Sequence, residues 1–313
     1  MLTKNQFALL SYIAVRPADE PALSQRAIAQ GTGKALGTVN GLVKQLDAMG
    51  YLDGANHITD AGRAALAPYR VDNAVIMAAG MSSRFAPLSY EKPKALLKVK
   101  GEVLIEREIR QLQAAGIDDI TIVAGYMKEK LFYLEDRFHV KIVINEDYHR
   151  YNNPSTLMLV RDRLKNTFIC SSDNYFEQNP FEPYVYQAYY ASLYSAGKTD
   201  EYCMVTNRKG RITGVQVGGS DAWYMIGHAY FDRSFSEKFT QILEREYDSP
   251  VTRAGLWEDL YARHIRELEM YIRRYDAEKI KEFDSLDELR AFDDKYVGDS
   301  GSAIFRNICG VLG

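Results

Sequence analysis

Four short apolar runs constrain the fold of this chain more than any other feature of its sequence. They have little polar alternation and are NAVIMAAG from Asn73, DITIVAG from Asp119, KIVIN from Lys141 and TFICSSD from Thr167. Runs of this kind are typical of strands buried on both faces of a parallel sheet. Helix-like patterns fall between them, near Val103–Ala115, Lys128–Phe138 and Ser155–Arg163. The alternation predicts an α/β fold with a mostly parallel, doubly wound sheet and right-handed crossovers.

The loop after the first run has the features of a phosphate site. In AVIMAAGMSSRFAPLSYEKPKALLKVKG, Gly80 allows a tight turn, and Met81, Ser82 and Ser83 leave backbone N–H groups exposed to an anion. Arg84 and Lys94 flank the turn, and two cations suit a polyphosphate. Neither a G-x-G-x-x-G motif nor a P-loop is completed. Because open α/β sheets bind ligands at the carboxyl ends of their strands, we expect a phosphate cradle here.

This stretch resembles the signature of the nucleotidyltransferases that activate sugar phosphates and alcohol phosphates. Its Ser82 stands where many members have a second glycine. The order of the later segments IEREIRQLQAAGIDDITIVAGYMKEKLFYLEDRF, IVINEDYHRYNNPSTLMLVRDRL, FICSSDNYF and LWEDLYARHIRELEMYI resembles the bacterial CTP:phosphocholine cytidylyltransferases, over roughly residues 72–290. The resemblance implies a nucleotide-diphospho-sugar transferase-like, Rossmann-like fold. It also implies transfer of CMP from CTP to phosphocholine, which gives CDP-choline and pyrophosphate.

The resemblance assigns the catalytic and metal-binding roles to a few charged residues. Arg84, Lys94 and Asp173 are the expected catalytic residues, with the two cations on the triphosphate. Nucleotidyl transfer joins two anionic phosphates, so we expect Mg²⁺ to screen their repulsion. Asp173, at the end of an apolar run, is the expected metal ligand, and Glu258 is the expected second one, where an Asp is more usual. The neighbouring Asp259 stays open as the alternative.

The resemblance also places the two substrates. The residues expected to bind the nucleotide are Ala78, Ala79, Gly80, Met81, Ser82, Ser83, Gly125, Tyr126, Asn152, Asn153 and Ser155. A trimethylammonium group cannot donate N–H hydrogen bonds, so the acceptor site should offer aromatic faces. The rings expected to supply them are Tyr202, Trp257, Tyr224 and Tyr230, the last two in a stretch with hairpin-like alternation.

The acceptor stays open among several small phosphates. Arg253 replaces an acidic residue of the family just before Trp257, which favours a phosphonate or a sugar phosphate. The alternatives to phosphocholine are phosphoethanolamine, 2-aminoethylphosphonate and a sugar 1-phosphate. A second alternative is a transcriptional regulator whose transferase-like domain senses a nucleotide without turning it over. The intact Asp173, Arg84 and Lys94 speak against such a sensor.

The first 70 residues form a separate region with a different pattern. Two amphipathic segments flank a glycine-rich turn at Gly31–Gly33, and GYLDGANHITDAG then resembles the wing of a winged helix-turn-helix domain. Seven Lys and Arg residues face five Asp and Glu residues here, a weakly basic balance. DNA binding, with Lys34, Thr38, Asn40 and Lys44 as contacts, and a packing or dimerisation role both stay open.

Length and composition are those of a globular enzyme. At 313 residues the chain is long enough for two domains, which we expect at 1–70 and 71–313. No apolar run is long enough to cross a bilayer and no signal peptide is recognisable, so we expect a cytoplasmic protein. The formal net charge of −3 argues against a general nucleic-acid binder. Cys170, Cys203 and Cys309 have no metal-ligand spacing and are expected to be reduced thiols. A homo-oligomer is left open.

Overall fold

The structure is a computed structural model of the chain, and it describes residues 1–17, 20–283, 285–296 and 302. Cys309, expected to be a reduced thiol, lies outside the described residues. Contacts divide the chain into two compact units: Met1–Val71 together with Glu182–Tyr186, and the remainder. The domain boundary expected after residue 70 stays a prediction, since Val71 and a segment from the middle of the chain group with the first unit.

The first unit is mainly helical. Its helices are α1 (Lys4–Ala14), α2 (Gln25–Thr32), α3 (Leu36–Ala48), α4 (Asp60–Leu66) and the short η1 (Ala67–Tyr69). The hydroxyls of Thr3, Ser24 and Thr59 cap α1, α2 and α4 by accepting backbone N–H groups. α2 ends at Gly33, whose φ of 64° is a left-handed conformation that suits glycine. A single antiparallel bridge joins Leu52 to Ile58, so the expected wing has no extended strands within the described residues. The winged helix-turn-helix assignment stays a prediction.

The core of the first unit includes residues from two distant parts of the chain. Phe7 of α1 lies 5.0 Å from Tyr69 and 5.3 Å from Tyr186, measured between ring centroids. The Tyr186 hydroxyl donates to the Leu2 carbonyl oxygen at 3.2 Å. Tyr184 also packs against this cluster. The 182–186 segment therefore helps to complete the apolar core of this unit.

The second unit contains a seven-stranded sheet with the strand order β10-β8-β9-β6-β1-β4-β5. Its strands are β1 (Asn73–Ala78), β4 (Ile120–Ala124), β5 (Lys141–Ile144), β6 (Thr167–Ser171), β8 (Tyr189–Thr206), β9 (Ile212–Phe231) and β10 (Tyr271–Arg274). The four apolar runs form β1, β4, β5 and β6, which pair in parallel with Ile76 opposite Ile122 and Cys170. β8 and β9 form the antiparallel hairpin expected after them. The predicted α/β fold is thus confirmed.

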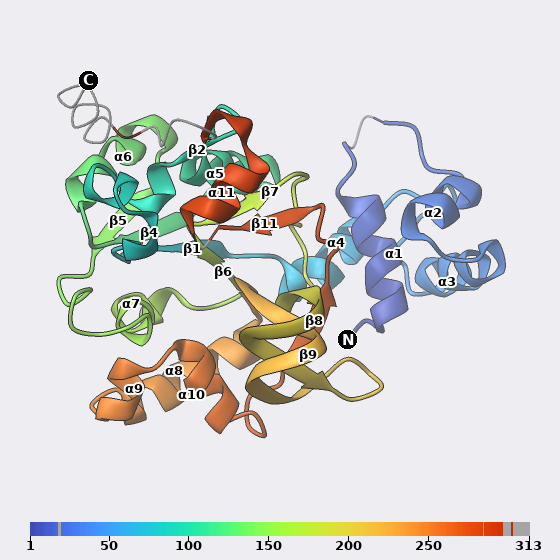
Figure 1. The fold of residues 1–313 in the computed structure, drawn as a ribbon. Coiled ribbons are helices and arrows are strands. Elements are labelled where there is room, and N and C mark those ends of the chain that lie inside the picture. Colours follow the sequence, from blue (N-terminus) through green and yellow to red (C-terminus); the bar gives the residue numbers. More distant parts are fainter. Residues whose placement is uncertain (18–19, 284, 297–301, 303–313) are drawn as a thin grey trace. The chain divides into compact units, whose positions relative to one another are not determined.

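Helices lie on both sides of the parallel strands (Figure 1). Figure 1 shows α5 (Leu104–Ala114) and α6 (Tyr133–Phe138) on one side of β1, β4 and β5, and α7 (Pro154–Leu159), α8 (Arg233–Glu246), α9 (Pro250–Ala254) and α10 (Trp257–Arg263) on the other. The remaining elements are η2 (Ser83–Phe85), η3 (Leu88–Tyr90), η4 (Lys94–Leu96), η5 (Lys128–Lys130), η6 (Arg161–Arg163), α11 (Leu286–Phe292) and η7 (Asp294–Tyr296), with the small pairs β2 (Lys98–Val99) and β3 (Glu102–Val103), and β7 (Asn174–Phe176) and β11 (Ile280–Glu282). This arrangement leaves the carboxyl ends of β1, β4, β5 and β6 at one edge of the sheet.

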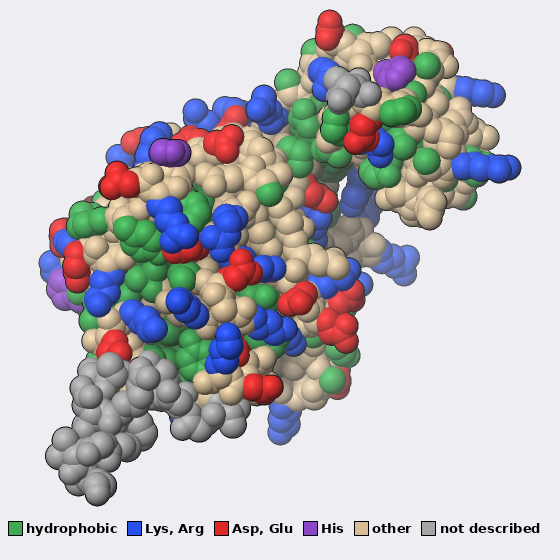
Figure 2. All heavy atoms as spheres, turned by 90° about the horizontal axis from the view of Figure 1, so that it is seen from above, with side chains coloured by type: hydrophobic (Ala, Val, Ile, Leu, Met, Phe, Trp, Pro, Cys, Tyr) green, Lys and Arg blue, Asp and Glu red, His purple; other side chains and the backbone are tan. Residues whose placement is uncertain are grey.

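The surface charges are mixed in sign. Seen from above the view of Figure 1, Lys and Arg side chains are interspersed with Asp and Glu side chains (Figure 2). On α5 and α6, Arg110 and Arg137 pair with Glu106 at 3.3 and 2.8 Å, and Arg107 pairs with Glu102. These cations are therefore engaged by neighbouring carboxylates. Within the part of the chain that the structure describes, no helix combines the length and the apolarity that a bilayer span requires.

Candidate active site

A pocket of about 210 Å³ opens at the carboxyl ends of β1, β5 and β6. It is lined by Met77, Ala78, Ala79, Gly80, Ser82, Pro93, Lys94, Ala95, Asn145, Tyr148, Tyr151, Asn152, Asn153, Thr156, Ser171, Ser172 and Asp173. The pocket thus brings together the turn after β1, the loop after β5 and the end of β6. Of the residues expected to act in catalysis or to bind the nucleotide or the metal, Met81, Ser83, Arg84, Gly125, Tyr126, Ser155 and Glu258 do not line it, and none of the four expected acceptor-binding rings does.

The turn after β1 has its left-handed backbone conformation at Ser82 and not at Gly80, where the sequence predicted it. Ser82 has a φ of 52°, in the left-handed region, at the position where many family members have glycine. Gly80 has no positive φ, and a Cβ built on it would meet no atom within 4 Å. Gly80 therefore leaves open space beside the strand end, where a side chain would occupy the cradle. Arg84, in η2, is exposed.

Gly125 is required by close packing at the end of β4. A Cβ on it would lie 2.7 Å from the Tyr148 Cβ and 2.8 Å from the Ala79 carbonyl oxygen. The Tyr126 N–H donates to that same carbonyl oxygen at 3.1 Å, and its hydroxyl donates to the Ser89 carbonyl oxygen at 2.8 Å. Gly125 and Tyr126 thus hold the turn after β1 in place from behind the pocket.

Lys94 and Asp173 meet in the pocket from positions 79 residues apart in the sequence. The Lys94 Nζ donates to the Asp173 Oδ2 at 2.6 Å, and Lys94 is only 8% exposed. The other carboxylate oxygen, Oδ1, is buried and has no hydrogen-bond partner. A buried carboxylate oxygen without a partner carries a desolvation cost, which a bound cation would offset. The pair therefore joins a cation that is expected to bind phosphate to a carboxylate with one oxygen available to a metal.

The donor atoms of the site suit a metal that is shared with a bound substrate. Among residues 1–17, 20–283, 285–296 and 302, no group of three or more His, Cys, Asp and Glu side chains could hold a metal by itself. Mg²⁺, however, commonly takes one or two carboxylates and completes its coordination with water and substrate phosphates. Asp173 with its free Oδ1 fits that mode of binding. It fits a metal held jointly with a nucleotide rather than by protein alone.

Glu258 lies at the start of α10 and is 6% exposed. Its Oε1 accepts from the Tyr190 hydroxyl at 2.8 Å, and its Oε2 accepts from the Asn153 Nδ2 at 3.4 Å. Burial raises the pKa of Glu258 to about 7. Asp259, the alternative ligand, accepts from the Tyr202 hydroxyl at 2.9 Å and from the Leu256 N–H at 2.7 Å. Both oxygens of Asp259 help to hold α10, and both oxygens of Glu258 also have partners, so Glu258 as the second carboxylate stays a prediction.

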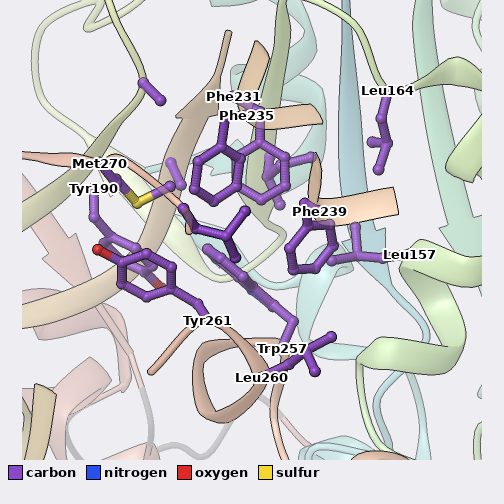
Figure 3. Packing of buried hydrophobic residues seen from close by; sticks show 14 of the residues in the cluster. Leu157, Leu164, Tyr190, Phe231, Phe235, Phe239, Trp257, Leu260, Tyr261 and Met270 are labelled. Atoms are coloured by element: carbon purple, nitrogen blue, oxygen red, sulfur yellow. The ribbon is translucent and has the colours of Figure 1, made fainter. Parts of the chain in front are cut away.

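Two of the expected acceptor-binding rings are core residues. Trp257 is 1% exposed, stacks on Tyr190 at 5.5 Å and meets Phe231 edge-on at 5.1 Å (Figure 3). Tyr230 is 0% exposed and lies 5.2 Å from Phe168. Rings covered on all sides cannot present a face to a ligand, so the expected cage does not agree with the placement of Trp257 and Tyr230. Their aromatic character serves packing.

The other two rings lie in different surroundings. Tyr202 is half-buried against the same core and bonded to Asp259. Tyr224 lines a second cavity of about 310 Å³, between the β8–β9 hairpin and the segment of β11 and α11, together with Glu201, Glu282 and Glu288. The two cavities approach each other at Gly227. A Cβ on Gly227 would lie 2.8 Å from the Ser171 side chain and 3.6 Å from the Glu282 Oε1.

The loop after β5 contains residues that the sequence singled out and others that it did not. Ser155 is buried, accepts from the Asn145 Nδ2 at 2.9 Å and donates to the Asn152 carbonyl oxygen at 2.8 Å, so it holds the loop. Asn145, Tyr148 and Ser172 were not predicted as pocket residues, whereas Tyr151 and Thr156 belong to the stretch YNNPST that the family resemblance assigns to the nucleobase. A signal existed for Asn145, because it is a polar residue at the carboxyl end of a predicted parallel strand. No local pattern marked Tyr148.

Comparison with known proteins adds three findings. A family model described as "MobA-like NTP transferase domain" matches residues 74–238. A 2-aminoethylphosphonate cytidylyltransferase of Lancefieldella rimae is 34% identical over 229 residues, which are 72% of this chain and 93% of the relative. A choline-phosphate cytidylyltransferase of Streptococcus pneumoniae is 31% identical over 221 residues, 71% of this chain and 96% of the relative.

Solved structures agree with the fold. The chain is similar to the CTP:phosphocholine cytidylyltransferase of Streptococcus pneumoniae, with a TM-score of 0.69 and 31% identity over 72% of this chain and 99% of that one. An inositol-1-phosphate CTP transferase from T. maritima is similar with a TM-score of 0.54 and 13% identity over 70% of this chain and 92% of that one. At that identity the second likeness concerns the fold alone.

Proposed function

Because the chain belongs to the MobA-like NTP transferase family, we propose that this nucleotidyltransferase passes CMP from CTP to a small phosphate or phosphonate that carries an ammonium group. 2-Aminoethylphosphonate is the acceptor that we favour, and phosphocholine is the second candidate. The products are the CMP-activated acceptor and pyrophosphate. The observation that carries the proposal is the contact of Lys94 with Asp173 beside the open turn at Gly80, in one pocket at the strand ends.

The residues of this pocket suit nucleotidyl transfer. An oxygen of the acceptor forms a bond to the α-phosphorus of CTP, and the bond from that phosphorus to the pyrophosphate oxygen breaks. The acceptor oxygen is already anionic, so no side chain needs to remove a proton. Lys94 and the backbone N–H groups after Gly80 would hold the phosphates and stabilise the charge that develops in the transition state. Positioning and electrostatics would supply the rate enhancement.

The site fits Mg²⁺ on the donor atoms described above. Asp173 would hold the ion through its Oδ1, which has no hydrogen-bond partner, and Glu258 is assigned as the second residue on the family resemblance. When bound, the ion screens the repulsion between the two phosphate groups. In its absence Lys94 neutralises the Asp173 carboxylate, which keeps a nearly buried charge paired.

The acceptor assignment rests on how each candidate cation is recognised. A trimethylammonium group needs aromatic faces. Trp257 and Tyr230 are buried in the core and offer no face to a ligand. A primary ammonium group donates hydrogen bonds that carboxylates accept. Glu282 lines the cavity of about 310 Å³, which also contains Lys281, and its Oε1 lies close to Gly227 beside Ser171 of the pocket, so its carboxylate is the group that we assign to the ammonium of the acceptor. These features support an acceptor with a primary ammonium group, and the similarity to a 2-aminoethylphosphonate cytidylyltransferase favours 2-aminoethylphosphonate over phosphoethanolamine.

Phosphocholine is kept as the second candidate because of Tyr202. The family resemblance gives this position to an aromatic residue that faces choline. Tyr202 is half-buried beside Asp259, so one ring and one carboxylate are together. An aromatic ring with an adjacent carboxylate is a recognised way to bind a quaternary ammonium group.

A matrix of pyrophosphate-release assays tests the proposal. It crosses CTP, UTP, ATP, GTP and dTTP with 2-aminoethylphosphonate, phosphoethanolamine, phosphocholine and a sugar 1-phosphate, in the presence of Mg²⁺. We expect the highest kcat/KM for CTP with 2-aminoethylphosphonate. A higher value with phosphocholine would replace the first candidate by the second. Absence of pyrophosphate release in every combination, with nucleotide binding retained, would favour the nucleotide-sensing regulator.

A further inference from the structure

The loop Tyr151–Asn153, which lines the nucleotide pocket, is bonded to the segment that carries Glu258. The Asn152 N–H donates to the Arg253 carbonyl oxygen at 2.9 Å. The Trp257 N–H donates to the Asn153 Oδ1 at 2.7 Å, and the Asn153 Nδ2 donates to the Glu258 Oε2 at 3.4 Å. These bonds span about a hundred residues of sequence, with separations of 104 and 105 for the two side-chain bonds of Asn153.

Asn153 supplies the side-chain hydrogen-bond acceptor that the residue before α10 lacks. The residue before the helix, Leu256, has no side-chain oxygen and makes no side-chain cap. The first N–H groups of a helix have no partner within the helix, and Trp257 is the first helical residue. The Asn153 amide oxygen accepts that N–H from a distant loop, and its NH₂ group reaches the carboxylate of the next residue. One side chain thus fixes both the beginning of α10 and the orientation of Glu258.

We propose that Asn153 is a positioning residue that orients Glu258 and couples the nucleotide pocket to it, and that it does not read the nucleobase. The inference rests on the proposed function, in which Glu258 is the second metal-binding carboxylate. Tyr190 and Asn153 each bond one oxygen of Glu258, so the carboxylate is held from two sides. A side chain that orients a metal-binding group through a hydrogen bond acts on turnover, and its loss typically costs roughly tenfold to a hundredfold in activity.

The amide group itself distinguishes positioning from capping. Asn153→Asp keeps an oxygen that can accept the Trp257 N–H, but it replaces the Nδ2 donor by a second carboxylate oxygen. Two carboxylates would then face each other at the Glu258 side, and like charges at that distance repel. If Asn153 only capped α10, Asn153→Asp would behave as wild type. If Asn153 positions Glu258, Asn153→Asp should lose turnover at least as severely as Asn153→Ala.

Kinetics of four variants test this role. We expect Asn153→Ala and Asn153→Asp to lower kcat by roughly tenfold or more, with the KM for CTP changed by less than about threefold. The double variant Asn153→Ala/Glu258→Gln should be no more than about twofold slower than Glu258→Gln alone, because the first substitution acts through the second residue. An increase in the KM for CTP with kcat unchanged would restore the base-reading role. Additive losses in the double variant, or wild-type kinetics of Asn153→Asp, would also overturn the proposal.

A binding experiment separates this inference from the proposed function. The chain has two tryptophans, so Trp223→Phe leaves Trp257, whose backbone N–H is bonded to Asn153, as the fluorescent reporter. We expect CTP with Mg²⁺ to change Trp257 emission in Trp223→Phe. The response should be lost in Trp223→Phe/Asn153→Ala, while calorimetry still detects CTP binding to that variant. Binding of CTP without a Trp257 response in the single variant would overturn the coupling. Absence of CTP binding to the wild-type chain would instead refute the proposed function.

Discussion

His228 should make the second unit sensitive to acid. Its imidazole is 0% exposed and lies among the rings of Phe168, Phe176, Phe181 and Tyr189, at centroid distances of 5.2 to 6.1 Å. Its Nδ1 has no hydrogen-bond partner. Burial, and to a smaller extent the Arg273 guanidinium, lower the pKa of His228 to about 3. The folded protein therefore keeps this imidazole neutral over a wide range of pH.

The expected effect follows from proton linkage. The imidazole of the unfolded chain, with a pKa of about 6.5, binds a proton at about pH 5, whereas the folded one does not. Stability is therefore lost as the pH falls below about 6.5, at about 1.4 kcal/mol per pH unit, and the loss ends near the folded pKa of about 3. Between about pH 8 and about pH 5, His228 alone should lower the free energy of unfolding by about 2 kcal/mol.

Replacing His228 by Phe removes the titrating group and keeps an aromatic ring. The measurement is urea unfolding at a series of pH values, followed by tryptophan fluorescence, since both tryptophans belong to the second unit. We expect the loss of unfolding free energy between about pH 8 and about pH 5 to be smaller in His228→Phe than in wild type by about 2 kcal/mol. The larger ring can add a cost in stability, but that cost does not depend on pH. His149→Gln, at an exposed histidine, is the matched control and should keep the wild-type pH dependence. Equal pH dependence in His228→Phe and wild type would refute the reasoning.

Three further predictions concern the active site and the core. Asp173→Asn should keep the fold, checked by circular dichroism, and lower turnover by roughly a hundredfold or more, because the charge that holds the metal is lost; near wild-type rates at saturating Mg²⁺ would contradict this role. Since burial raises the pKa of Glu258 to about 7, turnover should rise as the pH increases through about 7 and the carboxylate forms, and Glu258→Gln should abolish that rise. The same group should make the free energy of unfolding of the unliganded protein fall as the pH rises from about 4.5 to about 7, because the folded-state pKa lies above the unfolded one. Trp257→Ala should lower the free energy of unfolding by about 3–5 kcal/mol, as for other buried aromatic residues, rather than weaken one acceptor selectively; unchanged thermal stability with a raised KM for phosphocholine alone would restore the cage.

The sequence by itself determined the second unit's architecture and the position of its pocket. Apolar runs and helical patterns are local signals, and a short apolar run without alternation is the sequence pattern typical of a strand buried on both faces. The strand ends then follow, because parallel strands present their carboxyl ends at one edge. For this reason Gly80 and Asp173 are expected at one edge of the sheet, the family resemblance adds Lys94 and Asn152, and all four line one pocket.

The tertiary structure alone decided which groups meet and which are covered. The sequence placed Trp257 and Tyr230 at a ligand, but rings of other elements enclose them, and enclosure depends on residues far along the chain. Asn153 was expected to bind the nucleotide, and only the folded chain shows that its amide oxygen and nitrogen are also bonded to α10. Likewise the 182–186 segment belongs to the core of the first unit although no local pattern connects it to that region. Periodicity determines which face of an element is buried, whereas the free energy of burial and of hydrogen bonding depends on the partner, which only the folded chain supplies.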